Sequence, residues 1–449
     1  MSKFLKASLA ALTVLTCGGF TSHAAADIVL HKSDEWEFYT NGRIQAFLSY
    51  ANGDAYPVPP GGNIDLIAGG IEQAVAGSDA PNDRQGKHTS FRVRSGFTGT
   101  ELGFGMKTQL SPNVAMKGYV MINAVAESVD RRKYYPNWPD MRMSYVELSG
   151  DWGSFLAGRA LSLYSRGATD ITYLYGYKYN AGFVGSIDGV GPTAAHIGFG
   201  VLANGFAAGF KYESPRMAGL SLAVGLYDPS SLAGSLFNRT NEPRPEAELS
   251  YQVKLGDTGL LHLFANGAWQ KLYERNGTQD ITVLGAGYGG RLELGPVHLG
   301  LAGHMGDGLG IYYAFDFSEA TIGKPQQNNE PRRFEGYYAQ LQVALGKLDL
   351  QAGWGITRIR LLDSDRGNFL DDDTNPATPA VNDDADPATP DPFTENLIKH
   401  QMGISAGAVY HISDRLHFGL DYFRADFRWY LQEQKQVMNL VNAGLTMEW

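Results

Sequence analysis

Apolar and polar residues alternate one by one over long stretches of this chain. The clearest case is the C-terminal segment, whose apolar face carries Val441, Ala443, Leu445, Met447 and Trp449. Successive side chains of a strand point to opposite faces, so this period of two predicts a strand with one apolar and one polar face. The pattern recurs over 336–345, 348–357 and 402–408. We therefore expect an all-β protein.

Every second connection between these segments is short and rich in Gly, Pro, Asn or Asp, the residues that favour tight turns. Seven such turns are predicted, at 111–113, 150–153, 214–219, 256–259, 294–296, 346–347 and 413–415. Eight other connections, most of them longer, alternate with them near 51–87, 129–140, 161–195, 228–244, 274–280, 314–331, 363–395 and 431–435. Brief turns at one end and longer loops at the other are typical of outer-membrane barrels, and these connections join roughly 16 strands.

Two segments leave the strand count open. Segment 89–110 is long for one strand and contains either a bulge or a hairpin at Gly99-Thr100. Segment 197–213 offers a second hairpin, at Asn204-Gly205. Sixteen strands is the prediction, and about 18 would follow if both hairpins formed.

The first 26 residues have the three parts of a secretory signal: Lys3 and Lys6, an apolar run, and small residues ending at Ala26. The mature barrel is therefore expected to span 27–449. The chain has one cysteine, Cys17, and it lies in this leader, so neither a disulfide nor a thiolate metal site is expected. Beyond the leader, 35 basic residues stand against 47 acidic ones, a formal net charge of −12, which disfavours a nucleic-acid partner.

Beyond the leader, no apolar run approaches the roughly 20 residues of a membrane-spanning helix. Gly (55), Tyr (24) and Phe (22) are abundant, and charged residues make up only 19% of the chain. A closed barrel is the other structure that crosses a bilayer, and its strands need only alternate apolar with polar residues. The composition thus favours a transmembrane antiparallel β-barrel of the cell outer membrane.

Several short motifs resemble the general diffusion porins of Gram-negative outer membranes. They are Gly42-Arg43-Ile44, the segment 91–99, the segment 150–155 leading into Gly158-Arg159, and the terminal Trp449. The resemblance covers essentially the whole mature chain. It implies a homotrimer of 16-stranded barrels in which the third external loop folds into the lumen and narrows it. Loop 161–195 follows Gly158-Arg159 at the matching place and is the expected constriction loop.

A basic wall facing that loop is expected. The resemblance assigns Arg43, Arg94 and Arg159 to it, with His196 as a fourth member. Independently of the resemblance, Arg43, Arg92 and Arg94 alternate with apolar neighbours, so by strand parity they lie on the polar face of their strands. A lipid-facing Arg at mid-membrane would cost about 2 to 4 kcal/mol, so these three should point into the lumen. Lys117 is expected to join them in the lumen. Alternatively, these arginines are merely solvated, or they pair with loop carboxylates.

The expected loop side of the constriction is acidic, through Asp170 and Asp188. Together with the basic wall, these carboxylates would create a transverse field that orients water and favours polar solutes. The family's acidic Glu-Phe-Gly-Gly turn is present only as segment 182–185, without its acid, which leaves the charge balance open. The loop also carries tyrosines at period two, which form either a track for sugar rings or ordinary packing; they are Tyr173, Tyr175, Tyr177 and Tyr179.

The external loop 363–395 is crowded with Asp and ends in Glu395. It either concentrates cations at the pore mouth, binds Ca²⁺ or lipopolysaccharide through divalent bridges, or is simply a solvated acidic loop, which we favour. Its acidic spacing does not match a calcium-binding EF-hand.

The prediction is a passive, water-filled pore for small hydrophilic solutes and ions, with a weak cation preference, in contact with outer-membrane lipid and lipopolysaccharide. No catalytic motif is found, so no enzyme activity, cofactor or metal site is expected. A porin selective for a sugar or another nutrient is the alternative of the same class. A hydrolase or adhesin built on a barrel is the alternative of a different class, because a fold does not determine a function.

Overall fold

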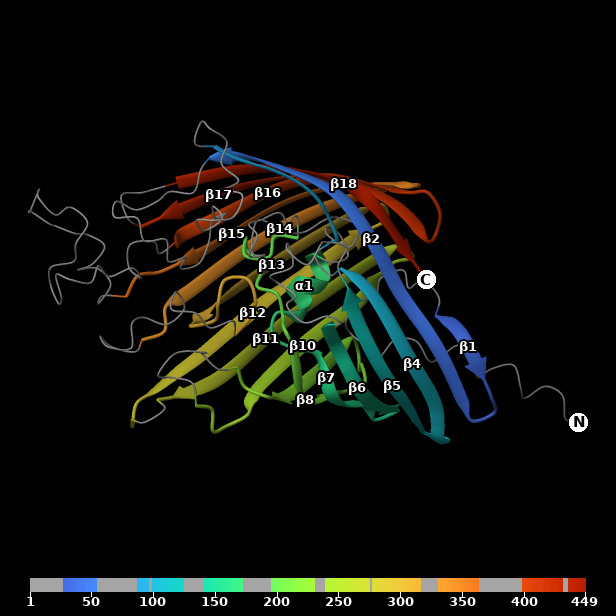
Figure 1. Ribbon diagram of the computed structural model, residues 1–449. Coiled ribbons are helices and arrows are strands. Elements are labelled where there is room, and N and C mark those ends of the chain that lie inside the picture. Colours follow the sequence, from blue (N-terminus) through green and yellow to red (C-terminus); the bar gives the residue numbers. More distant parts are fainter. Residues whose placement is uncertain are drawn as a thin grey trace, which may run out of the picture.

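The alternating segments form strands that pair antiparallel with their neighbours around a closed barrel (Figure 1). This computed structural model describes residues 27–54, 87–96, 99–124, 140–172, 195–230, 239–274, 277–315, 330–362, 398–430 and 435–449. The strands are β1 (Ile28–Lys32), β2 (Trp36–Asp54), β3 (Lys87–Arg94), β4 (Thr100–Ser111), β5 (Val114–Ala124), β6 (Asp140–Gly150), β7 (Gly153–Leu161), β8 (Phe206–Glu213), β9 (Leu220–Tyr227), β10 (Arg244–Leu255), β11 (Gly259–Tyr273), β12 (Asp280–Leu294), β13 (Val297–Asp307), β14 (Arg333–Leu345), β15 (Leu348–Ile359), β16 (Ile398–His411), β17 (Leu416–Trp429) and β18 (Lys435–Glu448). One helix is described, α1 (Arg166–Thr172).

The barrel closes where β18 pairs with β2, in a register that runs from Met438 opposite Gly53 to Glu448 opposite Arg43. The short strand β1 continues along the same edge of β2, beyond the end of β18. On the other edge of β2, β3 pairs with one half and β4 with the other. The 18 named strands therefore occupy 16 positions around the wall, which confirms the predicted all-β, 16-stranded barrel.

A bulge interrupts the strand made by β3 and β4. Between the pairs Arg94 with Phe47 and Glu101 with Arg43, this strand has six residues where β2 has three. Gly99 lies in the bulge with φ +72°, a conformation that glycine adopts without steric cost. Of the two readings of segment 89–110, the bulge is correct and the Gly99-Thr100 hairpin is wrong.

All seven predicted tight turns connect consecutive strands. They lie together at the end of the barrel where the C-terminus is marked in Figure 1, and the strand ends that the other connections join lie at the opposite end. These are called the turn end and the loop end below. Connection length alone therefore separates the two mouths of the barrel.

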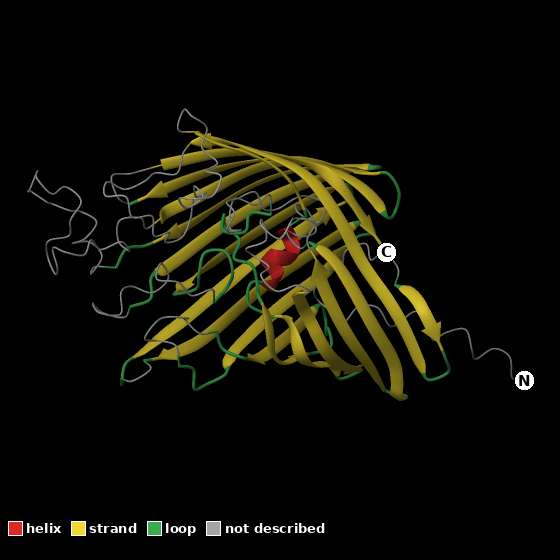
Figure 2. Ribbon diagram, in the orientation of Figure 1, coloured by secondary structure: helices red, strands yellow, loops and turns green. Residues whose placement is uncertain are grey.

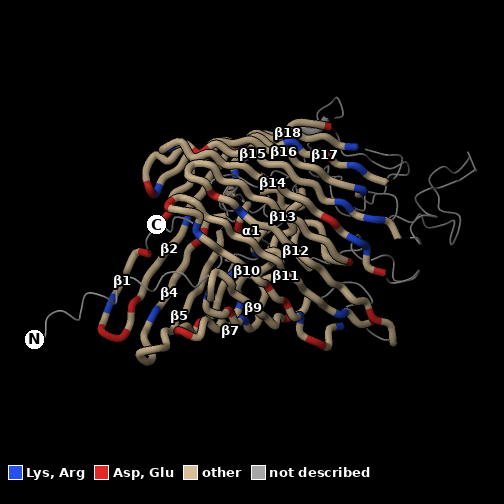
Figure 3. The backbone as a smooth tube through the Cα atoms, turned by 180° about the vertical axis from the view of Figure 1, so that it is seen from behind, with Lys and Arg blue, Asp and Glu red and all other residues tan. Residues whose placement is uncertain are grey.

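Side chains alternate between the outside and the inside of the wall. On β9, Leu220, Leu222, Leu226 and the other even-numbered residues are exposed on the outside, while the odd-numbered residues are buried inside. A wall whose outside is apolar suits lipid, as the period-two pattern predicts. On β14, β15, β16 and β18, charged residues lie near the two ends of the strands (Figure 3).

The inside of the barrel holds more than the predicted polar lining. The connection from β7 to β8 runs from Ser162 to Gly205, longer than the predicted 161–195, and it carries α1 into the barrel (Figure 2). A second connection, which leaves β13 after Asp307, also has buried residues at 309–315. The two are hydrogen-bonded to each other: Ala203 N donates to Tyr312 O at 2.9 Å, and Ala314 N donates to Ala203 O at 2.9 Å.

These inner segments form a hydrophobic core against the wall at β14–β18. Phe199 is fully buried, with its ring centroid 5.2 Å from that of Phe423 and 5.5 Å from that of Phe427 on β17. The alternative of a hairpin at Asn204-Gly205 is therefore wrong. The alternating apolar residues of 197–203 resemble a strand, but they are buried inside the barrel and belong to the inserted connection.

We expect Phe199→Ala to destabilise the folded protein by about 3 to 5 kcal/mol, because it leaves a cavity between two wall aromatics. Urea unfolding followed by far-UV circular dichroism measures the change. Phe210→Ala is the matched control, since Phe210 is 59% exposed on the outside of the barrel and its ring is not part of the core in the lumen. Equal effects of the two substitutions would contradict a packed core in the lumen.

Candidate pore constriction

Arg43 and Arg94 lie inside the barrel, as strand parity predicts. On β2, Arg43 is buried, while its neighbours Ile44 and Leu48 are exposed outside. Arg43 Nη2 lies 2.7 Å from Glu101 Oε2 on β4, and the Arg43 side chain is only 3% exposed. Arg94 is also buried, on β3. The side chain of Arg92 lies outside the described part of the chain.

Lys117 also lies on the inner face, beside a row of tyrosines near the turn end. Its Nζ is 5.2 Å from the ring centroid of Tyr119 and 5.6 Å from that of Tyr145, within range of cation–π attraction. Tyr119 Oη donates to Asn41 Oδ1 at 2.8 Å. Lys117 therefore contributes a positive charge to the lumen over an aromatic surface.

Arg159 does not belong to the inner wall, contrary to the expectation. It is exposed, and it shares a face of β7 with Phe155, which is also exposed. Its cross-strand neighbours Ser144 and Ala208 lie on the same outer face as Val146 and Phe210. Period two along β7 therefore directs Arg159 outwards, and the resemblance alone placed it in the lumen.

His196 is inside the barrel but is no part of a charged wall. It is fully buried, with Nε2 2.8 Å from Ser405 Oγ, and its ring lies 5.2 Å from those of Tyr338 and Phe423. Burial lowers the pKa of His196 to about 3, so the ring is neutral at physiological pH. Its role here is to pack the connection against the wall.

Only one residue of the predicted acidic loop can be placed. Asp170 lies in α1 and is partly exposed. Asp188 and the four tyrosines at 173–179 lie outside the described residues, as does the acidic loop 363–395. The predicted acidic side of the constriction stays a prediction.

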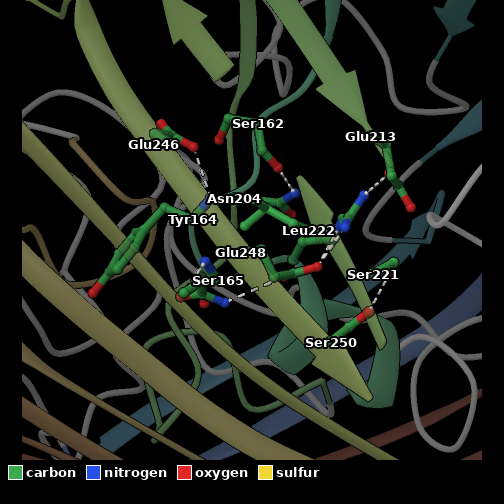
Figure 4. A network of polar contacts seen from close by, with 12 residues as sticks. Ser162, Tyr164, Ser165, Asn204, Glu213, Ser221, Leu222, Glu246, Glu248 and Ser250 are labelled. Carbon is green, nitrogen blue, oxygen red and sulfur yellow. Dashed lines mark hydrogen bonds and ion pairs between the residues drawn. The ribbon is translucent and has the colours of Figure 1, made fainter. Parts of the chain in front are cut away.

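The prediction sets a basic wall against an acidic loop, but in the described contacts the wall is acidic and the inner connection is basic (Figure 4). Arg166 of α1 donates from Nη1 to Glu213 Oε2 at 2.9 Å and from Nε to Glu248 Oε1 at 2.9 Å. Glu246 accepts from Tyr164 N at 2.7 Å and from Arg244 Nε at 2.8 Å. These carboxylates come from β8 and β10.

We call the contacts of Arg166 with Glu213 and Glu248 the Arg166 anchor. The sequence analysis does not predict it, although a signal for it exists. Glu213, Glu246 and Glu248 follow the inward parity of their strands, and a buried carboxylate requires a cationic or hydrogen-bonding partner. Arg166 begins α1 directly after the left-handed Ser165, whose φ is +65°. Such a conformation in a non-glycine residue persists where surrounding contacts hold it. The anchor therefore orients the start of the inserted segment.

On the described inner wall, several arginines and glutamates form ion pairs. Arg43 meets Glu101 on one side, and Arg166 and Arg244 meet Glu213, Glu246 and Glu248 on the other. No helix among the described residues is both long and apolar enough to cross a membrane. The arrangement is a strand-built wall, apolar outside, with a charged lumen that an inserted segment narrows.

The family comparison agrees with this geometry. The family described as Gram-negative porin matches residues 10–444. The chain belongs to the Gram-negative porin family. It is thus an integral β-barrel of the outer membrane, and its family and fold are those of a diffusion channel rather than an enzyme.

Three solved structures are similar to this porin in fold. The outer membrane channel DcaP of Acinetobacter baumannii gives a TM-score of 0.62 at 12% identity, covering 94% of this chain and 100% of the other. An anion-selective porin from Comamonas acidovorans gives 0.54 at 12% identity, covering 92% and 100%. Salmonella typhi OmpF in complex with daunomycin gives 0.53 at 12% identity, covering 93% and 99%. No curated protein matches the sequence.

We expect Arg166→Met to destabilise this porin by about 3 to 5 kcal/mol, because it leaves buried carboxylates without their cation. Loss of the anchor should also make single-channel conductance noisier. Urea unfolding and planar-bilayer recording measure the two effects.

The matched control for Arg166→Met is the triple variant that adds Glu213→Gln and Glu248→Gln. It removes the charges together and should regain much of the lost stability. Wild-type stability in Arg166→Met would contradict the anchor.

We expect His196 to make the protein less stable as pH falls from about 6.5 towards about 3. In this pH window the histidine binds a proton in the unfolded state but not in the folded state. Falling pH therefore stabilises the unfolded state and lowers the free energy of unfolding. His196→Gln should therefore show a flatter dependence of the free energy of unfolding on pH. Measurements at pH 8, where both forms of the histidine are neutral, serve as the reference. Identical slopes in the two proteins would contradict a buried neutral ring.

Proposed function

We propose that this porin is a water-filled channel for passive diffusion of small hydrophilic solutes and ions, with a weak preference for cations. The observation that carries the preference is the ion pair of Arg43 with Glu101 at 2.7 Å. A basic wall favours anions only if its charge is uncompensated. Glu101 offsets the charge of Arg43, so the net charge of −12 over residues 27–449 dominates the electrostatic potential of the channel. A negative potential attracts cations.

The proposed path for solutes runs along the wall of β2–β5. Inner side chains there keep contact with solvent: Lys107 is 42% exposed and Glu101 is 21% exposed, and Asp27, which precedes β1 and pairs with Lys107, is 32% exposed. On the opposite side, the inserted segments bury Phe199, Phe423 and their neighbours. A polar, partly solvated wall facing a packed one supports a narrowed aqueous passage.

The outer surface supports two further proposals. We propose a homotrimer, because a neighbouring protomer would keep the outward Arg159 away from acyl chains, where it costs about 2 to 4 kcal/mol. We also propose contact with lipopolysaccharide phosphates at the loop end of β15–β17, where exposed basic residues face outwards. They are Arg358, Lys399 and Arg424.

A substrate-selective porin is the second candidate function, favoured by the tyrosine row in the lumen. Tyr119 and Tyr145 are partly exposed, with ring centroids 5.6 Å apart, and the buried Tyr39 stacks on Tyr119 at 6.5 Å. Aromatic faces bind apolar faces of sugar rings. Block of the ion current by a sugar at low concentration would favour this candidate, and unhindered current would favour general diffusion.

Ion selectivity in planar bilayers tests the proposed preference. Glu101→Gln should shift the cation-to-anion permeability ratio towards anions by about threefold, and Arg43→Gln should shift it towards cations by a similar factor, as a single charge near the path implies. Both shifts should fade with rising salt, since screening acts beyond about 10 Å at 0.1 M.

Arg159→Gln is the matched control for ion selectivity and should leave the ratio unchanged, because Arg159 faces outwards. A channel that stays strongly anion-selective at every salt concentration would refute the cation preference. If Glu101→Gln and Arg43→Gln shifted the permeability ratio in the same direction, the proposal that Glu101 offsets the charge of Arg43 would be refuted.

A further inference from the structure

Four basic side chains form one cross-strand row near the loop end of the barrel. Arg358 of β15 is the partner of His400 of β16, which in turn pairs with Arg428 of β17. Lys435 of β18 completes the row opposite Arg428. We call these four residues the basic row. Figure 3 shows basic positions, in blue, gathered at the loop ends of these strands.

The basic row lies on the outer face of the wall. Arg358 and Lys435 are exposed, whereas their chain neighbours Ile359 and Gln436 are buried inside the barrel. The side chain of Arg428 is 36% exposed. The row is therefore accessible from the surroundings of the barrel and not from its lumen.

Such a row is unfavourable without a counter-charge. Directly opposed side chains on paired strands have Cβ atoms about 4.5–5.5 Å apart, and like charges in these positions destabilise the pairing. Asp426 compensates Arg428, accepting from its Nε at 2.8 Å and from its Nη2 at 3.3 Å. The side chains of Arg358 and Lys435 form no hydrogen bond or ion pair with the described residues. The row therefore has two cations available for an external anion.

The outer face around the row is also positively charged. Its described acidic residues on β14–β18 are Glu335 and Asp426, against six basic ones, an excess of four positive charges with histidine neutral. The net charge over residues 27–449 is −12, so this excess is local. The six basic residues are Arg333, Arg358, Lys399, Arg424, Arg428 and Lys435.

Towards the turn end, the same outer face becomes apolar. Trp354 and its cross-strand partner Ile404 are both exposed, four residues along their strands from the basic row. Tyr422 and Val441, which pair between β17 and β18, are exposed beside them. The apolar band of a barrel contacts acyl chains, so the basic row lies at the level of the lipid headgroups.

We propose that the basic row binds the phosphate groups of an outer-leaflet glycolipid, the lipid A part of lipopolysaccharide, directly and without a bridging divalent cation. This inference rests on the proposed contact with lipopolysaccharide and gives that contact a site and a mechanism. Arginine binds phosphate oxygens through parallel N–H groups, and lysine binds them as a point charge. The acyl chains cover Trp354 and Ile404 while the phosphates meet Arg358 and Lys435, so one lipid satisfies both parts of the surface.

Native mass spectrometry of the folded full chain in detergent, titrated with bisphosphorylated lipid A, tests the site. The double variant Arg358→Gln, Lys435→Gln should bind the lipid at least about tenfold more weakly, because it loses two charge-assisted hydrogen bonds. The chelator EDTA should leave the wild-type affinity unchanged. Loss of binding in EDTA would mean that divalent cations bridge the lipid, and it would overturn direct binding.

Lys271→Gln is the matched control. Lys271 lies on the outer face of β11 near the loop end, away from the basic row, and forms an ion pair with Asp280 at 2.9 Å. The substitution removes one positive charge from the same rim and should keep wild-type affinity, and circular dichroism verifies that each variant is folded. A loss equal to that of the double variant would mean that overall charge, not the basic row, holds the lipid.

Two further titrations identify the source of the phosphate. Dephosphorylated lipid A should bind at least about tenfold more weakly than the bisphosphorylated form, because it makes no charge-assisted hydrogen bonds with the row. Equal binding of the two lipids would overturn phosphate recognition. Inorganic phosphate at the same concentration should not displace the lipid, since it gains nothing from the apolar band. Displacement would assign the row to free phosphate and overturn the assignment to a lipid.

Conductance in planar bilayers separates this inference from the proposed channel. The basic row lies outside the barrel, so the double variant should keep wild-type conductance and ion selectivity. Equal lipid affinity of the double variant and the wild type would refute the basic row and leave the channel standing. Absence of conductance in the wild type would refute the channel and not the basic row.

Discussion

The whole structure depends on one requirement: every backbone amide and carbonyl at membrane depth needs a partner within the protein, because lipid offers none. The chain meets it by pairing each strand with two neighbours and closing the ring at β18 and β2. Closure then dictates the rest. Side chains must alternate between lipid and lumen, loops must gather at two rims, and any selectivity must come from what lines or enters the bore.

Inside that ring, the inserted connection is held by two different kinds of contact. Towards β14–β18 it is held by apolar packing around Phe199, and towards β8–β10 by the buried charge of Arg166. Three non-glycine residues with left-handed backbones, Ser165, His196 and Phe315, lie on these inner segments. Such conformations cost energy and persist only where packing determines them. The narrowing of the bore is therefore a rigid part of the fold on the side that the structure describes.

Local signals explain what the sequence predicts well. Period-two alternation and turn residues identify the strands and all seven turns, since both depend on neighbours in the chain. The inner parity of Arg43 and Arg94 follows from the same rule. The rule fails where tertiary context decides: segment 197–203 alternates like a strand yet packs inside, and His196 is buried by walls far away in sequence. For Arg159 the family motif predicts the lumen, whereas the alternation that it shares with the exposed Phe155 predicts the outer face, and the outer face is correct. The Arg166 anchor joins an inserted segment to residues on two wall strands, and its geometry becomes visible only once register is known.

The seam between β18 and β2 has a consequence for how this barrel is assembled. The Gln45 amide donates to Thr446 Oγ1 across 401 positions of sequence, while the other wall strands mostly pair with close chain neighbours. Contacts of such long range form slowly, because a large loop must close before they bring any gain. Until they form, both strands present bare edges that can recruit strands of other chains. The seam between β18 and β2 is therefore the part of the unfinished barrel that is open to pairing with another chain.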